Sequence, residues 1–212
     1  MFKIILFASA LSLSNLCYAD TVVFNNFTQT YGYANYGSVI GGPTNGSYFD
    51  EFAMSFTPAS SGYLSEVLLA FSVLGSSTGD NFNLWLSTDN AGLPNVAETT
   101  INFSTASSTE TMLGNALIHL NSSNQYFLEE NQRYWIGISS TQPGIIGAWW
   151  SSTLGKSTTV VERDLVLSPQ WLISPSYSSS AFSVSVTSVP APTAILLFIS
   201  GLLTLGFKAI KS

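Results

Sequence analysis

The sequence predicts an all-β fold, an antiparallel β-sandwich of the jelly-roll type, joined to a single C-terminal transmembrane helix. Aromatic residues make up 13% of the 212 residues and charged residues only 8%, against about a quarter in an average domain. Short stretches rich in β-branched and aromatic side chains recur between Gly, Pro, Asn and Ser residues. Within several stretches apolar and polar residues alternate, which is the period of a half-buried strand.

Ten stretches have this strand character: 21–24, 48–56, 63–74, 81–87, 97–103, 116–120, 133–139, 146–151, 158–161 and 181–187. Only 63–74 is long enough to remain ambiguous with a helix. In 81–87, Phe82, Leu84 and Leu86 share the predicted core face, and Trp85 lies on the predicted solvent face. In 181–187 the inward residues are the alternate ones that begin with Phe182. Two packed antiparallel sheets would bury such strands without disulfides.

Residues 1–19 have the pattern of a secretory signal peptide. Lys3 precedes an apolar run over 4–13, which is too short to span a bilayer, and the small residue Ala19 ends the segment. Cleavage there would also remove Cys17, the only cysteine. The alternative is a lipoprotein signal acylated at Cys17, but Leu16 stands before it where a small residue is normally required.

Residues 189–212 predict a membrane anchor. Prolines at 190 and 192 precede an apolar run over 194–207, which as a helix covers about 21 Å, and extending it to 193–210 gives about 27 Å of a core about 30 Å thick. A core helix docked on the domain is the alternative, which a helix apolar on nearly all sides disfavours. Residues 20–188 hold three basic residues and all twelve acids, so the positive ends are expected to stay cytoplasmic and the middle to be exported.

The C-terminal segment resembles the PEP-CTERM sorting signal of Gram-negative bacteria. Val189, Pro190 and Pro192 match its motif, Ala191 stands where the family usually has Glu, and an apolar helix and a basic tail follow. The resemblance implies processing by an exosortase, an integral-membrane transpeptidase-like enzyme, during export to the surface or to the extracellular polysaccharide matrix. Without processing, the membrane would retain the protein through one helix.

The middle region, residues 20–188, resembles the choice-of-anchor families of exported β domains. The matching segments are 23–27, 53–58, 84–94 and 134–138, the last followed by Trp149. The resemblance implies display at the cell surface and no particular activity.

Composition excludes several functions. A net charge of −6 leaves no basic surface for nucleic acid, and one Cys and one His do not make a disulfide scaffold or a typical metal site. His119 is expected to be a solvent-facing strand residue rather than a catalytic base, and no Gly-x-Ser-x-Gly motif occurs. We expect no catalysis.

Carboxylates remain as candidates for hydrolysis or cation binding. The pairs Asp50-Glu51, Glu129-Glu130 and Glu162 with Asp164 are expected to be solubilising surface charge rather than a glycosidase pair. We expect no cofactor. A structural calcium ion near Asp80 and Asp89 is a weaker alternative to ordinary turn chemistry at both positions.

Tryptophans supply the candidate binding site, a possible glycan platform at Trp85, Trp149 and Trp150. Since Trp149 and Trp150 are consecutive, one is expected in the core and the other exposed. Trp171 is expected in a loop, and Tyr31, Tyr33 and Tyr36 in a glycine-rich loop or a packed edge.

We therefore expect an exported protein of the cell surface or extracellular matrix, with the membrane, an exosortase-type enzyme and extracellular polysaccharide as its potential partners. The alternative is a secreted module that binds or hydrolyses carbohydrate.

Overall fold

In a computed structural model, the described part of the chain forms fourteen antiparallel strands. The structure describes residues 20–28, 31–41, 51–73, 81–95, 97, 99–104, 117–122, 126–140, 146–154, 158–165, 168–174 and 178–187. All of them belong to one compact unit, Asp20–Thr187. The prediction of an all-β fold with antiparallel sheets is confirmed, and each of the ten expected stretches overlaps a strand.

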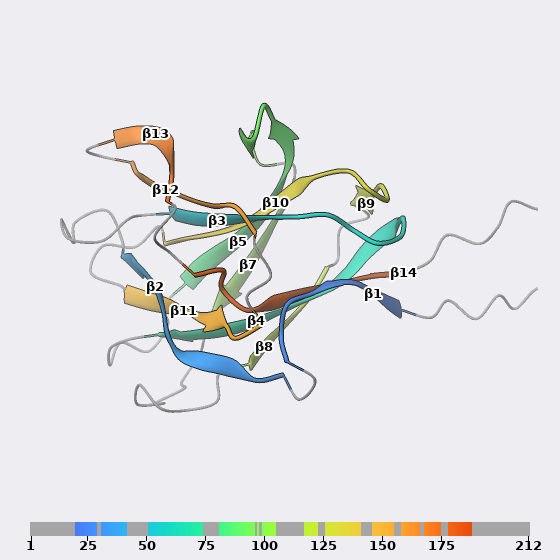
Figure 1. The fold of residues 1–212 in the computed structure, drawn as a ribbon, viewed down its shortest axis with the longest axis horizontal. Helices are drawn as coiled ribbons and strands as arrows, with labels where there is room; N and C mark the ends of the chain where they lie inside the picture. Colours follow the sequence, from blue (N-terminus) through green and yellow to red (C-terminus); the bar gives the residue numbers. More distant parts are fainter. Residues whose placement is uncertain are drawn as a thin grey trace, which may run out of the picture. The chain divides into compact units, whose positions relative to one another are not determined.

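Two seven-stranded sheets make up this unit (Figure 1). The first sheet contains β1 (Asp20–Asn25), β2 (Tyr33–Gly41), β4 (Gly62–Val73), β8 (Leu117–Asn121), β9 (Phe127–Leu128), β11 (Ile146–Ser152) and β14 (Phe182–Thr187). The second contains β3 (Glu51–Phe56), β5 (Asn81–Asn90), β6 (Leu93–Pro94), β7 (Thr99–Ser104), β10 (Tyr134–Ser140), β12 (Val160–Asp164) and β13 (Ser168–Ile173).

One apolar core lies between the two sheets, because both contribute inward side chains to it. The expected alternation is confirmed: Phe82, Leu84 and Leu86 of β5 are buried there, as are Phe182 and the alternate residues of β14. Aromatic rings join the two sides, and Phe56 of the second sheet lies edge-on to Phe182 of the first with ring centroids 6.0 Å apart.

Each sheet also buries apolar side chains on its outer face. The cluster outside the first sheet consists of Phe27, Leu68, Ala70, Ala148, Trp150 and Ala181. The cluster outside the second sheet consists of Ala53, Trp85, Trp135 and Val161, with Leu93 and Trp171 packed against it. The outer faces are therefore not the uniformly wet surfaces that simple alternation suggests.

The first sheet divides along β4, because the two parts of this long strand pair with different strands. β14 pairs with β4 from Tyr63 to Leu69, and β11 pairs with it from Phe71 to Val73. Asn26 joins β1 to β14 near this division: its amide donates to Ser180 O (2.8 Å), and its Oδ1 accepts from Phe182 N (2.7 Å). Its main-chain carbonyl also accepts from the Ser152 hydroxyl. Asn26 is fully buried, so its side chain supplies the hydrogen bonds that water cannot supply to these buried backbone groups.

Four strands lie in segments not predicted as strands: β2, β6, β9 and β13. β6 and β9 are only two residues long. The prediction of a loop around Trp171 is wrong, because that residue lies in β13, which pairs with β12. β2 is a terminal strand of the first sheet and holds Tyr33 and Tyr36, so these two residues lie at a sheet edge and not in a loop, although Tyr36 is exposed.

The first and last strands of the unit are neighbours. Asp20 and Thr187 are register partners in the β1–β14 pair, and the Thr187 hydroxyl donates to the Asp20 carboxylate (2.7 Å). The signal segment, the motif Val189-Pro190-Pro192 and the apolar run lie outside the described residues. Among the residues that are described, no helix is long and apolar enough to cross a membrane.

Candidate functional site

The tryptophans proposed as a glycan platform do not lie together, and none is an exposed side chain. Trp149 is in the core, where its indole N–H donates to Ala181 O (3.1 Å). Trp150 points to the opposite side of β11 and donates to the Ser72 hydroxyl (2.9 Å). The prediction that one of the pair is exposed is therefore wrong, because apolar side chains cover both faces of β11 at this point.

Trp85 lies outside the second sheet, in a separate stack of aromatic and charged side chains. Its ring centroid is 5.6 Å from that of Trp171, and the Arg163 guanidinium lies over the Trp171 ring, 4.3 Å from its centroid. Arg163 also forms an ion pair with Glu51, its register partner. The prediction that Trp85 faces solvent is wrong because β13 brings Trp171 over it.

Gly137 explains how Trp85 can lie so close to the sheet. A Cβ atom at position 137 would be 2.1 Å from the Trp85 ring, so only glycine leaves room for the indole. Trp135, on the same face, is fully buried and donates its indole N–H to Asp89 (2.7 Å). This arrangement is a packed layer with interlocked partners rather than an accessible platform.

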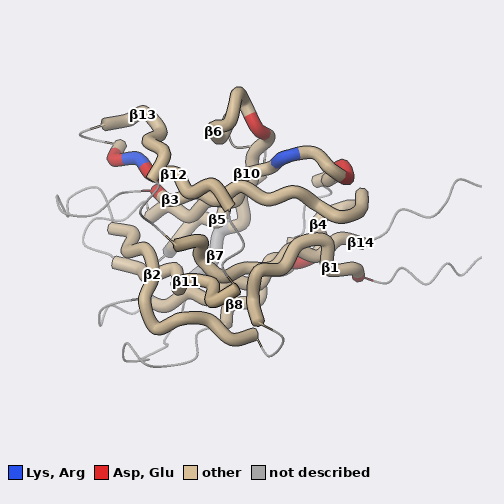
Figure 2. Tube along the Cα trace, viewed as in Figure 1, with Lys and Arg blue, Asp and Glu red and all other residues tan. Residues whose placement is uncertain are grey.

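Charged residues are sparse in the described part of the chain, where Arg133 and Arg163 are the only Lys or Arg residues (Figure 2). His119 faces solvent as predicted: 62% of its side chain is exposed, and its Nδ1 lies 2.5 Å from Glu66 Oε1. His119 and Glu66 therefore form a surface ion pair when the imidazole is protonated.

The prediction of surface charge is wrong for Glu51 and Glu162, which are both buried. Glu51 is held by Arg163. Burial raises the pKa of Glu162 above its ordinary value of 4.5, and a hydrogen bond with Ser174 opposes that rise. Its Oε2 has no hydrogen-bond partner. A bulge separates Glu162 from Asp164 in the pairing with β13, so the two carboxylates do not repeat regularly along the strand.

Asp89 stabilises a turn, as the sequence predicts. Its Oδ2 accepts from Gly92 N (3.1 Å), and the turn places both Ala91 and Gly92 at positive φ, 54° and 88°. The other oxygen is bound by Trp135. Asp80 lies outside the described residues. Among the residues that are described, no three His, Cys, Asp or Glu side chains gather as a metal site would require.

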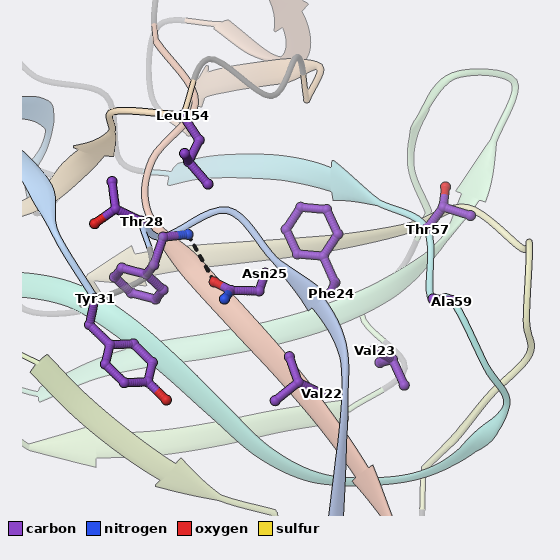
Figure 3. A pocket seen from close by; sticks show the side chains of 10 residues that line it. Val22, Val23, Phe24, Asn25, Thr28, Tyr31, Thr57, Ala59 and Leu154 are labelled. Carbon is purple, nitrogen blue, oxygen red and sulfur yellow. Dashed lines mark hydrogen bonds between the residues drawn. The ribbon is translucent and has the colours of Figure 1, made fainter.

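A hollow of about 690 Å³ lies beside β1, and we call it the β1 hollow (Figure 3). Its lining residues are Val22, Val23, Phe24, Asn25, Phe27, Thr28, Tyr31, Thr57, Ala59 and Leu154. They come from β1, from the turn that follows it, and from the segments after β3 and after β11. None of them carries a charge.

Sequence reasoning did not find the β1 hollow, although it noted Tyr31 as part of an aromatic cluster. Tyr31 lies in this wall, whereas Tyr36 lies on β2 and is not part of the lining. The signal available in the sequence was an aromatic residue beside a glycine at a turn, which does not show what lies opposite it. Comparison with known proteins finds no family model and no curated protein that matches the chain.

Proposed function

We propose that this chain is an exported protein of the cell surface or extracellular matrix, which acts by being displayed and not by catalysis. It consists of a jelly-roll-like β-sandwich tethered to the membrane by a C-terminal helix. The main support is the pair of hydrophobic end segments with lysine flanks around a middle region that contains all twelve acids. An exosortase-type enzyme would cut the tether near Val189-Pro190-Pro192.

The pairing of β1 with β14 supports this arrangement. Because Asp20 and Thr187 are register partners, the two ends of the β unit leave it side by side. A tether that follows Thr187 would therefore leave the unit next to its first strand. Export also accords with a mature chain that has lost Cys17, its only thiol.

Intact-mass measurement of protein from the cell surface and from the medium tests the proposal. We expect a surface form that begins at Asp20, and a released form that also lacks the residues after the 189–192 motif. Replacing Ala191→Glu restores the residue usual in PEP-CTERM signals and is expected to increase the released fraction. Ala97→Glu, which adds the same charge at an exposed position of the β unit, is the control.

Recovery of full-length protein from the cytosol, with residues 1–19 attached, would show that the proposal is wrong. Equal release of the Ala191→Glu and Ala97→Glu variants would show that the motif is not read by a processing enzyme. The alternative, a secreted module that binds or hydrolyses carbohydrate, draws no support from Trp85, Trp149 and Trp150, because these side chains are buried.

A further inference from the structure

The β1 hollow presents an aromatic ring at a fixed place. Tyr31 has a positive φ of 55°, a conformation that costs a non-glycine residue free energy and is often found at binding sites. Three hydrogen bonds hold the turn. Tyr31 N donates to Thr28 O (3.0 Å), Thr28 N donates to Gly32 O (3.3 Å), and Gly32 N donates to the Thr28 hydroxyl (2.8 Å). The Tyr31 ring lies edge-on to Phe27, with centroids 5.8 Å apart. It is nevertheless 50% exposed, so ring surface remains available.

The apolar part of the wall continues on both sides of this ring. Val22 and Leu154, at 55% and 47% exposed, are partly open to solvent, and Phe24 is partly buried by stacking on Phe182 (4.8 Å). Figure 3 shows Tyr31 and Val22 along one side, Leu154 above them and Thr57 at the far end. The hollow is thus an open, partly apolar trough and not a closed cavity. An acyl chain bound in it would remain partly exposed to water.

The polar groups of the wall are neutral. Asn25, Thr28, Thr57 and Tyr31 supply one amide and three hydroxyls. The amide of Asn25 has a defined orientation, because its Oδ1 accepts from Phe27 N (2.8 Å; Figure 3). The described lining residues include no carboxylate, ammonium or guanidinium, so none of them would compensate an ionic ligand for its lost hydration.

We propose that the β1 hollow binds an uncharged saccharide segment, one sugar ring of which stacks on Tyr31. A sugar ring has an apolar face and a rim of hydroxyls that both donate and accept, which matches a wall of one exposed ring with neutral hydrogen-bonding groups beside it. The volume of about 690 Å³ lies within the range of small-molecule sites, about 300–1,000 Å³. This inference rests on the wall and not on the proposed export.

Binding is measured on the full chain, purified in lauryldimethylamine oxide because that detergent has no sugar headgroup. The ligands are maltotriose, cellotriose and N-acetylchitotriose, with trigalacturonate as the anionic control. Saturation-transfer NMR and calorimetry are expected to show saturable binding of at least one uncharged trisaccharide below about 10 mM, and none of trigalacturonate. In the NMR experiment, the protons on one face of a single sugar ring should receive most of the saturation.

Two variants and one matched control locate the site. Tyr31→Ala is expected to weaken binding about tenfold or more, whereas Tyr31→Phe keeps the ring and should change it less than about threefold. Tyr36→Ala removes an equally exposed tyrosine outside the hollow, 58% against 50%, and should leave binding unchanged. Leu154→Ala tests the wall through a second element and should also weaken binding.

Thermal unfolding of each variant separates lost binding from lost folding. Only variants with the melting temperature of the parent protein are compared. The proposal is overturned if no uncharged trisaccharide binds, if trigalacturonate binds equally well, or if Tyr36→Ala weakens binding as much as Tyr31→Ala. None of these results depends on where the cell places the protein, and the intact-mass measurement does not depend on sugar binding. Failure of one proposal is thus distinguishable from failure of the other.

Discussion

Asn26 offers the sharpest test of how this fold is held together. Replacing Asn26→Ala removes both side-chain hydrogen bonds and leaves Ser180 O and Phe182 N without partners, and both of these residues are fully buried. An unpaired buried polar group costs about 1–3 kcal/mol, so the two together predict a loss of about 2–6 kcal/mol. For a domain of this size that loss lowers the melting temperature by roughly 5–20 °C.

Thermal and urea unfolding of the full chain measures this loss, followed by circular dichroism. Asn26→Asp nearly preserves the volume and the acceptor for Phe182 N, but it places a carboxylate against Ser180 O, so it should also destabilise strongly. Asn35→Ala, at an exposed position of β2, is the control and should change stability by less than about 0.5 kcal/mol. If Asn26→Asp is as stable as the parent, the hydrogen bond from the Asn26 amide to Ser180 O does not contribute to stability as argued.

Three further predictions concern the second sheet. Gly137→Ala should cost about 1–3 kcal/mol in urea unfolding and alter the near-ultraviolet dichroism, since its Cβ would lie 2.1 Å from the Trp85 ring; an unchanged spectrum would contradict this. Arg163→Ala should destabilise the protein by about 1–3 kcal/mol, because it leaves the buried Glu51 carboxylate unpaired. Adding Glu51→Gln should recover part of that loss, and equal stability of the single and double variants would refute this explanation. Burial in the folded state raises the pKa of Glu162, so the contribution of its protonated form to stability is complete below about pH 4.5 and declines as the pH rises through the folded pKa. Glu162→Gln should therefore flatten the pH dependence of the melting temperature between pH 4.5 and the folded pKa.

Strand positions were largely predictable from sequence because strand formation leaves a local signal. Alternation in 81–87 and 181–187 placed the core residues of β5 and β14 correctly, since the face of a strand follows from parity alone once one residue is known to be buried. β2 and β13 were missed because glycine or proline interrupts their pattern, and in both cases pairing with a neighbouring strand decides the conformation.

Exposure was predicted less well because it depends on what lies over a face. Trp85 was assigned to solvent by parity, and its side of the strand was indeed opposite the core, but Trp171 and Leu93 cover it. Glu162 was assigned to the surface because carboxylates usually lie there, yet it is 8% exposed. Leu93 and Trp171 come from β6 and β13, which single-strand periodicity does not place, and β13 also pairs with Glu162.

The amino-acid sequence by itself determined the all-β class, most of the strands and the inward face of those with clear alternation, because each of these follows from local chemistry and a two-residue period. Only the tertiary structure decided that Trp85, Trp149 and Trp150 are all buried, that Asn26 joins β1 to β14, and that a hollow with uncharged lining residues lies beside β1. These features bring together segments far apart in the chain, and no local pattern records which strand will lie beside which.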